Sequence, residues 1–581
     1  MVSHEVDTRH AVREAAESAR RRLRHFDPTL LLFLAAALVL VALVANPLIR
    51  LIWTSFQDAQ TGAFTLANYA AAYGRARYLG ALWNSLLLGA GVSALSLVLA
   101  VPLAWAVSRT DMPGKGLVRL LVLSAFITPP YLGAVGWILL AGPNSGWINR
   151  AVMALTGAQE GLVNIYSFPG LIFIIAIYSF PYLFIFTSAA LDVVSSEMED
   201  AANILGAGTW RTTLRVTLPL VLPSILGGLI VIFLEAIALF GSPALIAIPA
   251  RFNVVTTQLW QFFENPVRVE VAAAYSMPLL GITVALFWLQ QRITRRKGFV
   301  ALTGKGGERR PLRLGAFRWV LLGYSLLVVS LSVVLPYLCI AQAAFAKAWG
   351  RGWSLDNVTL GNFSYILSDH FARQSIFNSF GFAAASAFLA IGLALLIAYI
   401  VQRRLVPFAN VLSFLSMAPF VIPGIVLAIG FYAAYAPPPL ALYGTATILI
   451  LAFATRFLPI AFANMSAAIR ALNPEMEEAV RILGGGRLLA IRRVVAPLMK
   501  QSLVGAWLLV FIPATRELST AVFLYGPNTR TISILLLDWS EEGNFEKLSA
   551  LGMILLVATI VIVALGYRLV GRDFMIRRRQ S

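Results

Sequence analysis

The chain has 581 residues, of which 59% are hydrophobic and only 13% charged, and its mean hydropathy is +0.79. A soluble globular protein carries about 25% charged residues, so this composition excludes an ordinary soluble enzyme. The formal net charge of +19 does not indicate a nucleic-acid partner, because the basic residues gather in alternate loops between long apolar runs; the single cysteine excludes a disulfide framework and a multi-cysteine metal site.

The apolar runs are long enough to cross a membrane, since a spanning helix needs about 20 such residues. They predict an all-α polytopic membrane protein with about twelve transmembrane helices. The first run follows a basic stretch at 20–24 but is longer than the apolar core of a signal peptide, so we expect a retained helix. In chain order the runs lie near 29–53, 82–108, 117–141, 166–190, 220–247, 271–290, 317–343, 376–401, 408–435, 443–468, 498–525 and 547–569.

Lys and Arg are concentrated in the loops on one side of these spans. That side includes the N-terminal tail (1–28), the central segment 291–316 and the C-terminal tail (570–581). Positively charged loops stay in the cytoplasm, so an even number of spans places both termini there. The excess charge then reports orientation and contact with anionic membrane lipid.

The second part of the chain repeats the first. Asn84-Ser85 recurs at 378–379, displaced by 294 residues (378−84), and Phe180-Pro181 aligns with 458–459, displaced by 278 (458−180). The difference of 16 residues (294−278) predicts a longer loop between the third and fourth spans of the first half. We therefore expect two parallel six-helix halves enclosing a path along the membrane normal. The halves are 29–290 and 317–569, joined by a cytoplasmic linker at 291–316.

A longer motif follows the fourth span of each half, at 198–219 and 476–497, again displaced by 278 (476−198). Acidic residues in a first helical turn favour the helix dipole, small residues permit close approach of a partner, and a glycine ends the helix. We expect a short helix across the cytoplasmic face in each half. The motif residues are Glu199, Asp200, Ala201, Ala202, Gly206 and Pro219 in the first copy and Glu477, Glu478, Ala479, Gly484 and Pro497 in the second.

This motif resembles the EAA loop of the permease subunits of ABC importers. The family pattern has Glu, Ala and Leu where this chain has Asp200, Val480 and Ala496, which are conservative departures. The resemblance implies a coupling helix that docks into an ATPase subunit, a homodimer of such subunits, a periplasmic substrate-binding protein and a location in the bacterial inner membrane.

The same resemblance implies a transport subunit that is not itself an enzyme and that needs no cofactor and no resident metal. The chain shows no P-loop, because Gly304-Lys305 is followed by Gly306 and not by Ser or Thr. ATP hydrolysis is therefore expected in a separate nucleotide-binding subunit.

Charged residues inside a membrane are costly and are candidates for function. Glu235 lies in the fifth span, and Arg516 and Glu517 lie in the eleventh, the equivalent helix of the second half. The fifth helix lines the pore in the family that the chain resembles, so these residues are candidates for the translocation path. Arg516 and Glu517 could instead compensate each other in a packing network, and the sequence leaves that alternative open.

The segments 233–241 and 516–521 are similar to those of ferric-iron permeases, in which two fused halves are also common. Ferric iron is therefore the first expectation for the substrate, with thiamine, phosphonate or another small solute as alternatives. A secondary transporter of the major facilitator type would share twelve spans and parallel halves, but the paired EAA-like loops favour the importer. A membrane-embedded enzyme would need clustered His, Asp or Glu at one membrane face, and the sequence shows no such cluster.

Overall fold

The computed structural model describes residues 29–264, 266–296 and 311–570. Within these ranges the chain is helical, with no strand and three isolated β-bridges. The predicted tail at 1–28, most of the predicted linker (297–310) and all but the first residue of the predicted tail at 570–581 lie outside the described residues.

The helices of the first half begin after residue 28, and the last of them continues to Arg296, through the first six residues of the predicted linker. In chain order they are α2 (Thr29–Leu40), η1 (Val41–Ala45), α3 (Asn46–Ser55), α4 (Ala67–Tyr73), α5 (Ala76–Arg109), α6 (Lys115–Ile127), α7 (Pro130–Ala141), α8 (Trp147–Thr156), α9 (Phe168–Leu191), α10 (Ser196–Ile204), α11 (Thr209–Thr212), η2 (Thr213–Thr217), α12 (Leu218–Ala238), α13 (Gly241–Ile246), α14 (Val255–Gln261) and α15 (Val269–Arg296).

The second half repeats this order, with a shorter connection between its third and fourth spans. Its elements are α16 (Phe317–Val329), η3 (Ser330–Val334), α17 (Leu335–Ala344), η4 (Trp349–Arg351), η5 (Leu355–Asn357), α18 (Gly361–Ser368), α19 (His370–Gln402), α20 (Ala409–Met417), η6 (Ala418–Phe420), α21 (Gly424–Tyr435), α22 (Ala446–Ala471), α23 (Glu475–Ile482), α24 (Arg487–Ala490), η7 (Ile491–Val495), α25 (Ala496–Leu498), α26 (Lys500–Thr515), η8 (Ala521–Phe523), α27 (Ile532–Glu541) and α28 (Phe545–Val570).

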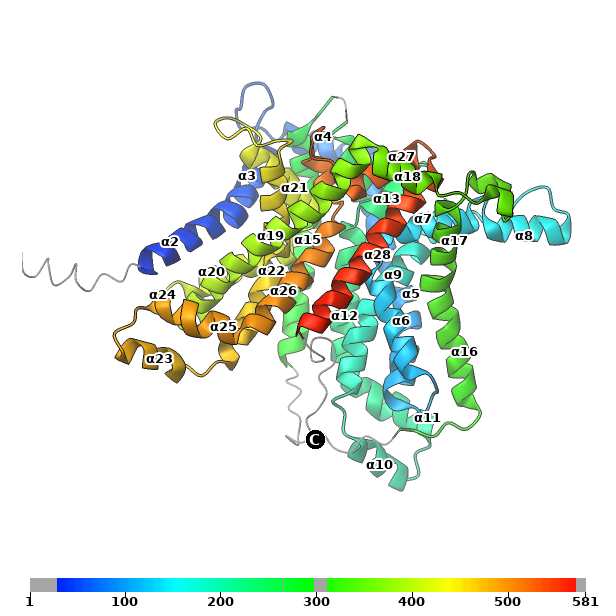
Figure 1. Cartoon of the computed structure of the whole chain (residues 1–581), viewed down its shortest axis with the longest axis horizontal. Helices are drawn as coiled ribbons and strands as arrows, with labels where there is room; N and C mark the ends of the chain where they lie inside the picture. The colour runs from blue at the N-terminus through cyan, green and yellow to red at the C-terminus, as the bar shows by residue number, and fades with distance from the viewer. Residues whose placement is uncertain (1–28, 265, 297–310, 571–581) are drawn as a thin grey trace, which may run out of the picture.

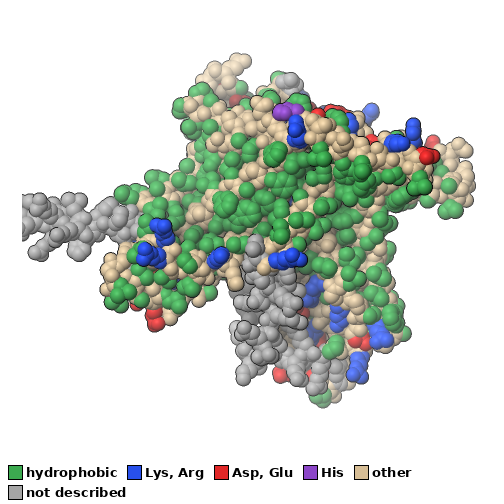
Figure 2. All heavy atoms as spheres, viewed as in Figure 1, with side chains coloured by type: hydrophobic (Ala, Val, Ile, Leu, Met, Phe, Trp, Pro, Cys, Tyr) green, Lys and Arg blue, Asp and Glu red, His purple; other side chains and the backbone are tan. Residues whose placement is uncertain are grey.

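The number of membrane spans agrees with the prediction. Among the described residues, nine helices are long and apolar enough to cross a membrane, and three further bent pairs bring the number to twelve if each pair is one span. Apolar side chains form a broad band around the middle of the bundle, and charged side chains gather toward its two ends (Figure 2). The all-α polytopic fold is therefore confirmed.

The third span of each half is bent, whereas the sequence predicted continuous spans at 117–141 and 408–435. The two pieces of the first (α6 and α7) meet at 102°, and those of the second (Ala409–Phe420 and α21) at 114°. The breaks fall at Pro129 and Pro423. Proline removes a backbone donor and pushes the preceding residue toward extended backbone, so the helix stops there and restarts in a new direction.

The fifth span of each half ends earlier in the chain than predicted. The sequence placed these spans at 220–247 and 498–525, but α12 ends at Ala238 and α26 at Thr515. In the second half the span also bends by 77° between Arg487–Leu498 and α26. Beyond each end the chain turns back through short helices, α13 and α14 in one half and η8 and α27 in the other.

The repeated Asn-Ser dipeptides hold these returning segments in place. Each Asn side chain donates to a backbone carbonyl of the segment, and each Ser hydroxyl accepts from a backbone N–H two residues later. The bonds are Asn84 to Asn253 O (2.9 Å), Val255 N to Ser85 Oγ (2.8 Å), Asn378 to Arg530 O (2.8 Å) and Ile532 N to Ser379 Oγ (2.7 Å). The sequence repeat therefore corresponds to the same contact made twice.

The first span of each half packs on the other half. Helix α3 contacts α21, and α17 contacts α7. A Cβ atom at Gly136 of α7 would lie 2.7 Å from Pro336, and one at Gly430 of α21 would lie 2.8 Å from the carbonyl of Pro47. The two glycines are displaced by 294 residues (430−136), so the two halves exchange their first spans in an equivalent way.

Candidate functional site

The two EAA-like loops fold alike. Helix α10 ends at Ile204 and α23 at Ile482, and two residues later Gly206 and Gly484 both adopt a φ of +80°. Only glycine enters this left-handed region freely. The next residue closes the helix end, with Ala207 N donating to Ala202 O at 3.0 Å and Gly485 N donating to Val480 O at 2.9 Å. The predicted helix and its terminating glycine are thus present in both halves.

Each loop leads directly into the fifth span. In the first half the helix from Thr209 to Ala238 is continuous, with the π-helical turn η2 just before Pro219. In the second half η7 precedes Pro497, and the bend at Met499 follows. A displacement of α10 would therefore be transmitted along α12, the helix that carries Glu235.

Glu199 of α10 is buried in an ion pair with Arg109, the last residue of α5. Their side chains are 4% and 3% exposed. The hydroxyl of Thr217 donates to the same carboxylate at 2.7 Å, and Arg109 also donates to the Val194 carbonyl at 3.1 Å. Helix α10 is therefore held against the end of the second span.

The second half has the same pair. Arg403, which caps α19, donates to Glu477 through Nε at 3.0 Å and through a terminal nitrogen at 2.6 Å. Here Tyr399 supplies the second donor, at 2.7 Å. The arginines are displaced by 294 residues (403−109) and the glutamates by 278 (477−199), as the repeat requires. The ion pair is thus kept in both halves, while the neutral donor comes from a different helix in each.

Arg109 and Arg403 were not among the site residues predicted from the sequence, although both fit the 294-residue displacement found for the Asn-Ser dipeptides. The two neighbouring acidic residues of each motif were predicted together, but the structure separates them. Asp200 and Glu478 are exposed, whereas Glu199 and Glu477 are buried. One residue of a helix is a rotation of about 100°, so adjacent carboxylates face opposite environments.

Apolar side chains are exposed to solvent at the C-terminal ends of α10 and α23. Ile204 and Leu205 are 86% and 87% exposed, and Ile482 and Leu483 are 84% and 87% exposed. Ala201 and Ala479 are exposed beside them. Exposed apolar groups clustered with carboxylates are typical of a protein-binding surface, and here the same surface occurs once in each half.

The structure brings Glu235 and Arg516 together. The Glu235 carboxylate on α12 interacts with Arg516 and Arg456 of the second half, and with Ser179 and Tyr182 of α9. Glu235, Arg456 and Arg516 are all partly buried, and their electrostatic attraction acts between the two halves.

Arg516 lies just past the end of α26, so its predicted place within the eleventh span was wrong. From there it donates to the carbonyl oxygens of Phe126, at 3.1 Å, and Ile127, where α6 ends. Arg456 of α22 likewise donates to Ile422 O at the break of the other third span. At the break of each third span, an arginine from outside that span therefore donates to backbone carbonyl groups.

Glu517 takes part in a local turn. Its carboxylate accepts from the backbone N–H of Thr520 at 2.9 Å and from the Thr520 hydroxyl at 3.0 Å. It does not share the Arg516 contacts with α6. The structure thus separates the two adjacent residues that the sequence had grouped as path candidates.

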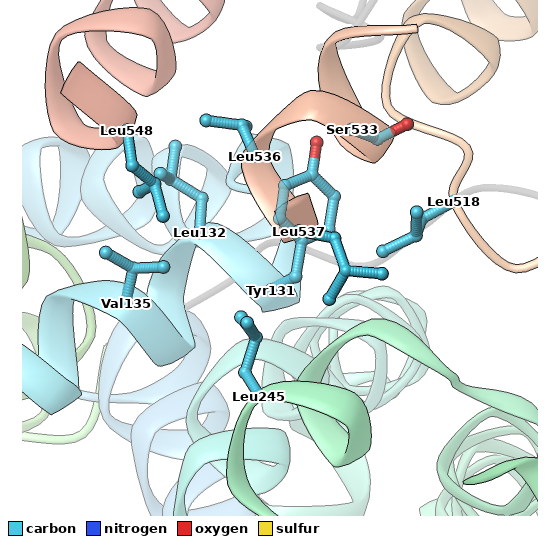
Figure 3. Close-up of a pocket in the computed structure, with 9 residues that line it drawn as sticks. All are labelled: Tyr131, Leu132, Val135, Leu245, Leu518, Ser533, Leu536, Leu537 and Leu548. Carbon is cyan, nitrogen blue, oxygen red and sulfur yellow. The ribbon is translucent and has the colours of Figure 1, made fainter. Parts of the chain in front are cut away.

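A small cavity lies where the two halves meet near the second piece of the third span (Figure 3). Its volume is about 10 Å³, roughly what a single water molecule needs. In Figure 3 the ring of Tyr131 lies among leucine side chains from α27 and α28. The halves are therefore closed against each other at this point. Among the described residues, no group of three or more His, Cys, Asp or Glu side chains could hold a metal ion.

Comparison with known families gives a match over most of the chain. The family described as the binding-protein-dependent transport system inner membrane component matches residues 28–298 and 390–572. The two matched stretches fall in the two halves of the repeat.

Individual relatives share 26–29% sequence identity with this chain. The ferric transport system permease protein FbpB of Actinobacillus pleuropneumoniae is 26% identical over 557 residues, which is 94% of this chain and 79% of that protein. A putative ferric transport system permease protein of Haemophilus influenzae is 27% identical, covering 78% of this chain and 71% of its own length. The molybdenum transport system permease protein ModB of Escherichia coli is 29% identical over 32% of this chain and 81% of its own length.

Proposed function

Because the chain belongs to the family of binding-protein-dependent transport system inner membrane components, the permeases of ABC importers, we propose that it carries ferric iron across the bacterial inner membrane. The substrate assignment rests on the two relatives that span most of both chains, which are named as ferric transport permeases. Molybdate is the second candidate, because ModB matches 32% of this chain.

The proposal that ATP supplies the energy rests on the pair of equivalent EAA-like loops. Each presents an apolar tip and an exposed carboxylate. Each is held to its own half by an Arg–Glu pair, which is buried in the first half and partly buried in the second. Two like surfaces suit two identical partners, so a homodimer of ATPase subunits would meet one loop on each half. In this proposal Ala201, Ala202 and Ala479 let the partner approach closely, and Gly206 and Gly484 shape the helix end.

The orientation follows from the same assignment. The loops after the fourth span of each half face the ATPases in the cytoplasm, and both termini lie on that side. The periplasmic binding protein would then dock on the opposite face, at the segments that follow the fifth spans.

Transport is proposed to occur by alternating access. ATP is bound by the ATPase subunits, and its affinity is higher in one global state of the importer than in the other. ATP binding therefore favours the arrangement of the two halves that belongs to that state. Closure of the ATPases would move α10 and α23, and the connected helices α12 and α26 would separate or rejoin the halves. The small cavity in Figure 3 then corresponds to a closed state.

Glu235 is proposed to stabilise that closed state through Arg516. Glu235→Gln removes the carboxylate that faces two arginines of the other half, so we expect the halves to part more easily. We expect the ATPase activity measured without binding protein to rise at least threefold, or the substrate-driven uptake to fall at least threefold. Glu160→Gln, in the exposed loop after α8 and outside the segments that follow the fifth spans, is the control. If both activities of Glu235→Gln equal those of the control, Glu235 has only a packing role.

The direct test of the substrate is uptake into sealed vesicles that contain the permease, its ATPase and its binding protein. We expect labelled ferric iron to accumulate, and a tenfold excess of molybdate or thiamine to leave its uptake unchanged.

A further inference from the structure

An apolar groove lies beside the end of the first span of the second half. One wall is the last two turns of α17, with Leu338 and Ala341, and the other is the loop that follows, with Phe345, Trp353 and Val358. Its volume is about 180 Å³, and an apolar cavity of about 150 Å³ accommodates a benzene-sized molecule. The groove is thus large enough for part of a hydrocarbon chain.

The groove lies at the boundary between membrane and water. The span Phe317–Ala344 ends beside it, at the end of the bundle away from α10 (Figure 1). Three tryptophans meet here: the Trp147 ring lies 6.1 Å from that of Trp349 and 5.6 Å from that of Trp353. Tryptophan is enriched at the membrane–water interface, so this cluster marks the level of the lipid headgroups.

Helix α8 extends sideways from the bundle at the same level (Figure 1). It belongs to the long loop predicted between the third and fourth spans of the first half, which runs from 142 to 167, whereas its counterpart in the second half covers 436–445. Leu155 of α8 is 86% exposed. A short helix with bare apolar residues at this depth is typical of a segment lying in the membrane interface.

Positive charge surrounds the mouth of the groove. The Arg150 guanidinium of α8 packs on Gly352, where a Cβ atom would lie 2.7 Å from it. Lys347 and Arg351 are exposed in the same loop. The acids near them are the exposed Asp356 and the half-buried Glu546, whose carboxylate accepts from the Trp349 N–H at 2.6 Å. The three cations come from both halves of the chain and outnumber these two acids.

We propose that this groove binds an anionic phospholipid, with one acyl chain between α17 and Trp353 and the phosphate near Arg150, Lys347 and Arg351. The apolar walls match the chain, and the cations match the headgroup. Leu338 is 48% exposed on this face, so the groove opens where acyl chains are found. The lipid would contact α8 of one half and the α17 loop of the other, at a junction between the two halves.

The test uses the full importer in vesicles that contain phosphatidylglycerol with a photoreactive acyl chain. After illumination, we expect the label on the peptide that covers 338–358. Ala341→Trp fills the groove and should lower that labelling at least fivefold. Leu326→Trp places the same ring on an exposed position of the same span and should leave it unchanged.

A second pair of variants tests the headgroup. Arg150→Gln with Arg351→Gln should lower labelling by photoreactive phosphatidylglycerol relative to photoreactive phosphatidylcholine, whereas Arg373→Gln, at an exposed arginine outside the groove, should not. Equal labelling of the Ala341→Trp and Leu326→Trp proteins would overturn the proposal. Equal labelling of the groove by both lipids in every arginine variant would also overturn it. The proposal would fail as well if Ala341→Trp weakened binding-protein docking and left lipid labelling intact.

Discussion

Replacing Gly206 and Gly484 together by valine should lower ATP-driven uptake at least tenfold while membrane insertion stays normal. Both glycines have a φ of +80°, and a Cβ atom at either position would meet nothing within 4 Å. The effect therefore comes from backbone strain and not from a clash. Left-handed backbone costs a residue with a Cβ about 1–2 kcal/mol, or about 2–4 kcal/mol for both sites. That shifts the population of correctly ended helices by roughly 30- to 700-fold.

The chain contains a matched control for this experiment. Gly208 and Gly486 lie two residues farther on in the same loops, also with open space around them, but their φ values are −69° and −75°. Valine at both positions should preserve most of the uptake. Asparagine tolerates left-handed backbone better than other residues, so Gly206→Asn with Gly484→Asn should recover part of the activity. Similar losses in the two valine pairs would contradict a specific role for the helix ends.

Glu199→Gln should release α10 from the end of the second span. Removing one partner of a buried ion pair costs about 3–5 kcal/mol, because the other charge is left uncompensated. Arg109 would then face only the Val194 carbonyl and neutral groups. We expect faster trypsin cleavage after the exposed Arg211 and at least a tenfold loss of iron transported per ATP hydrolysed.

The neighbouring carboxylate and the paired arginine give the controls. Asp200→Asn removes an exposed charge one residue away and should leave the trypsin cleavage rate unchanged. Arg109→Gln combined with Glu199→Gln leaves no unpaired charge and should be less harmful than Glu199→Gln alone. The second half should behave in the same way. Glu477→Gln should be the most harmful variant, Arg403→Gln combined with Glu477→Gln should be less harmful, and Glu478→Gln should leave the cleavage rate unchanged. If Asp200→Asn and Glu199→Gln behave alike, the buried pair does not position the loop.

The architecture could be predicted because its signals are local in the sequence. Runs of about 20 apolar residues define spans, and the motif copies at 198–219 and 476–497 share one displacement. The loop difference was also confirmed, with α8 in the longer loop. In these cases a pattern of residue types is enough, because the membrane itself imposes helix.

The bends and the charge contacts were harder to predict. Membrane helices tolerate proline, so Pro129 and Pro423 did not by themselves distinguish a kink from a break. What decides is the arginine that satisfies the freed carbonyl groups, and Arg516 reaches them from almost 400 residues away. The pairing of Arg109 with Glu199 likewise depends on how the second span meets the motif helix, which no local pattern records.

In the proposed function, ATP hydrolysis by a separate subunit drives import through this chain. The most direct measurement is ferric-iron uptake into sealed vesicles that contain the permease, its ATPase and its binding protein. We predict uptake with ATP on the ATPase side and none with a proton gradient in the absence of ATP. Uptake driven by the gradient alone, in vesicles lacking the ATPase, would show a secondary transporter and contradict the account.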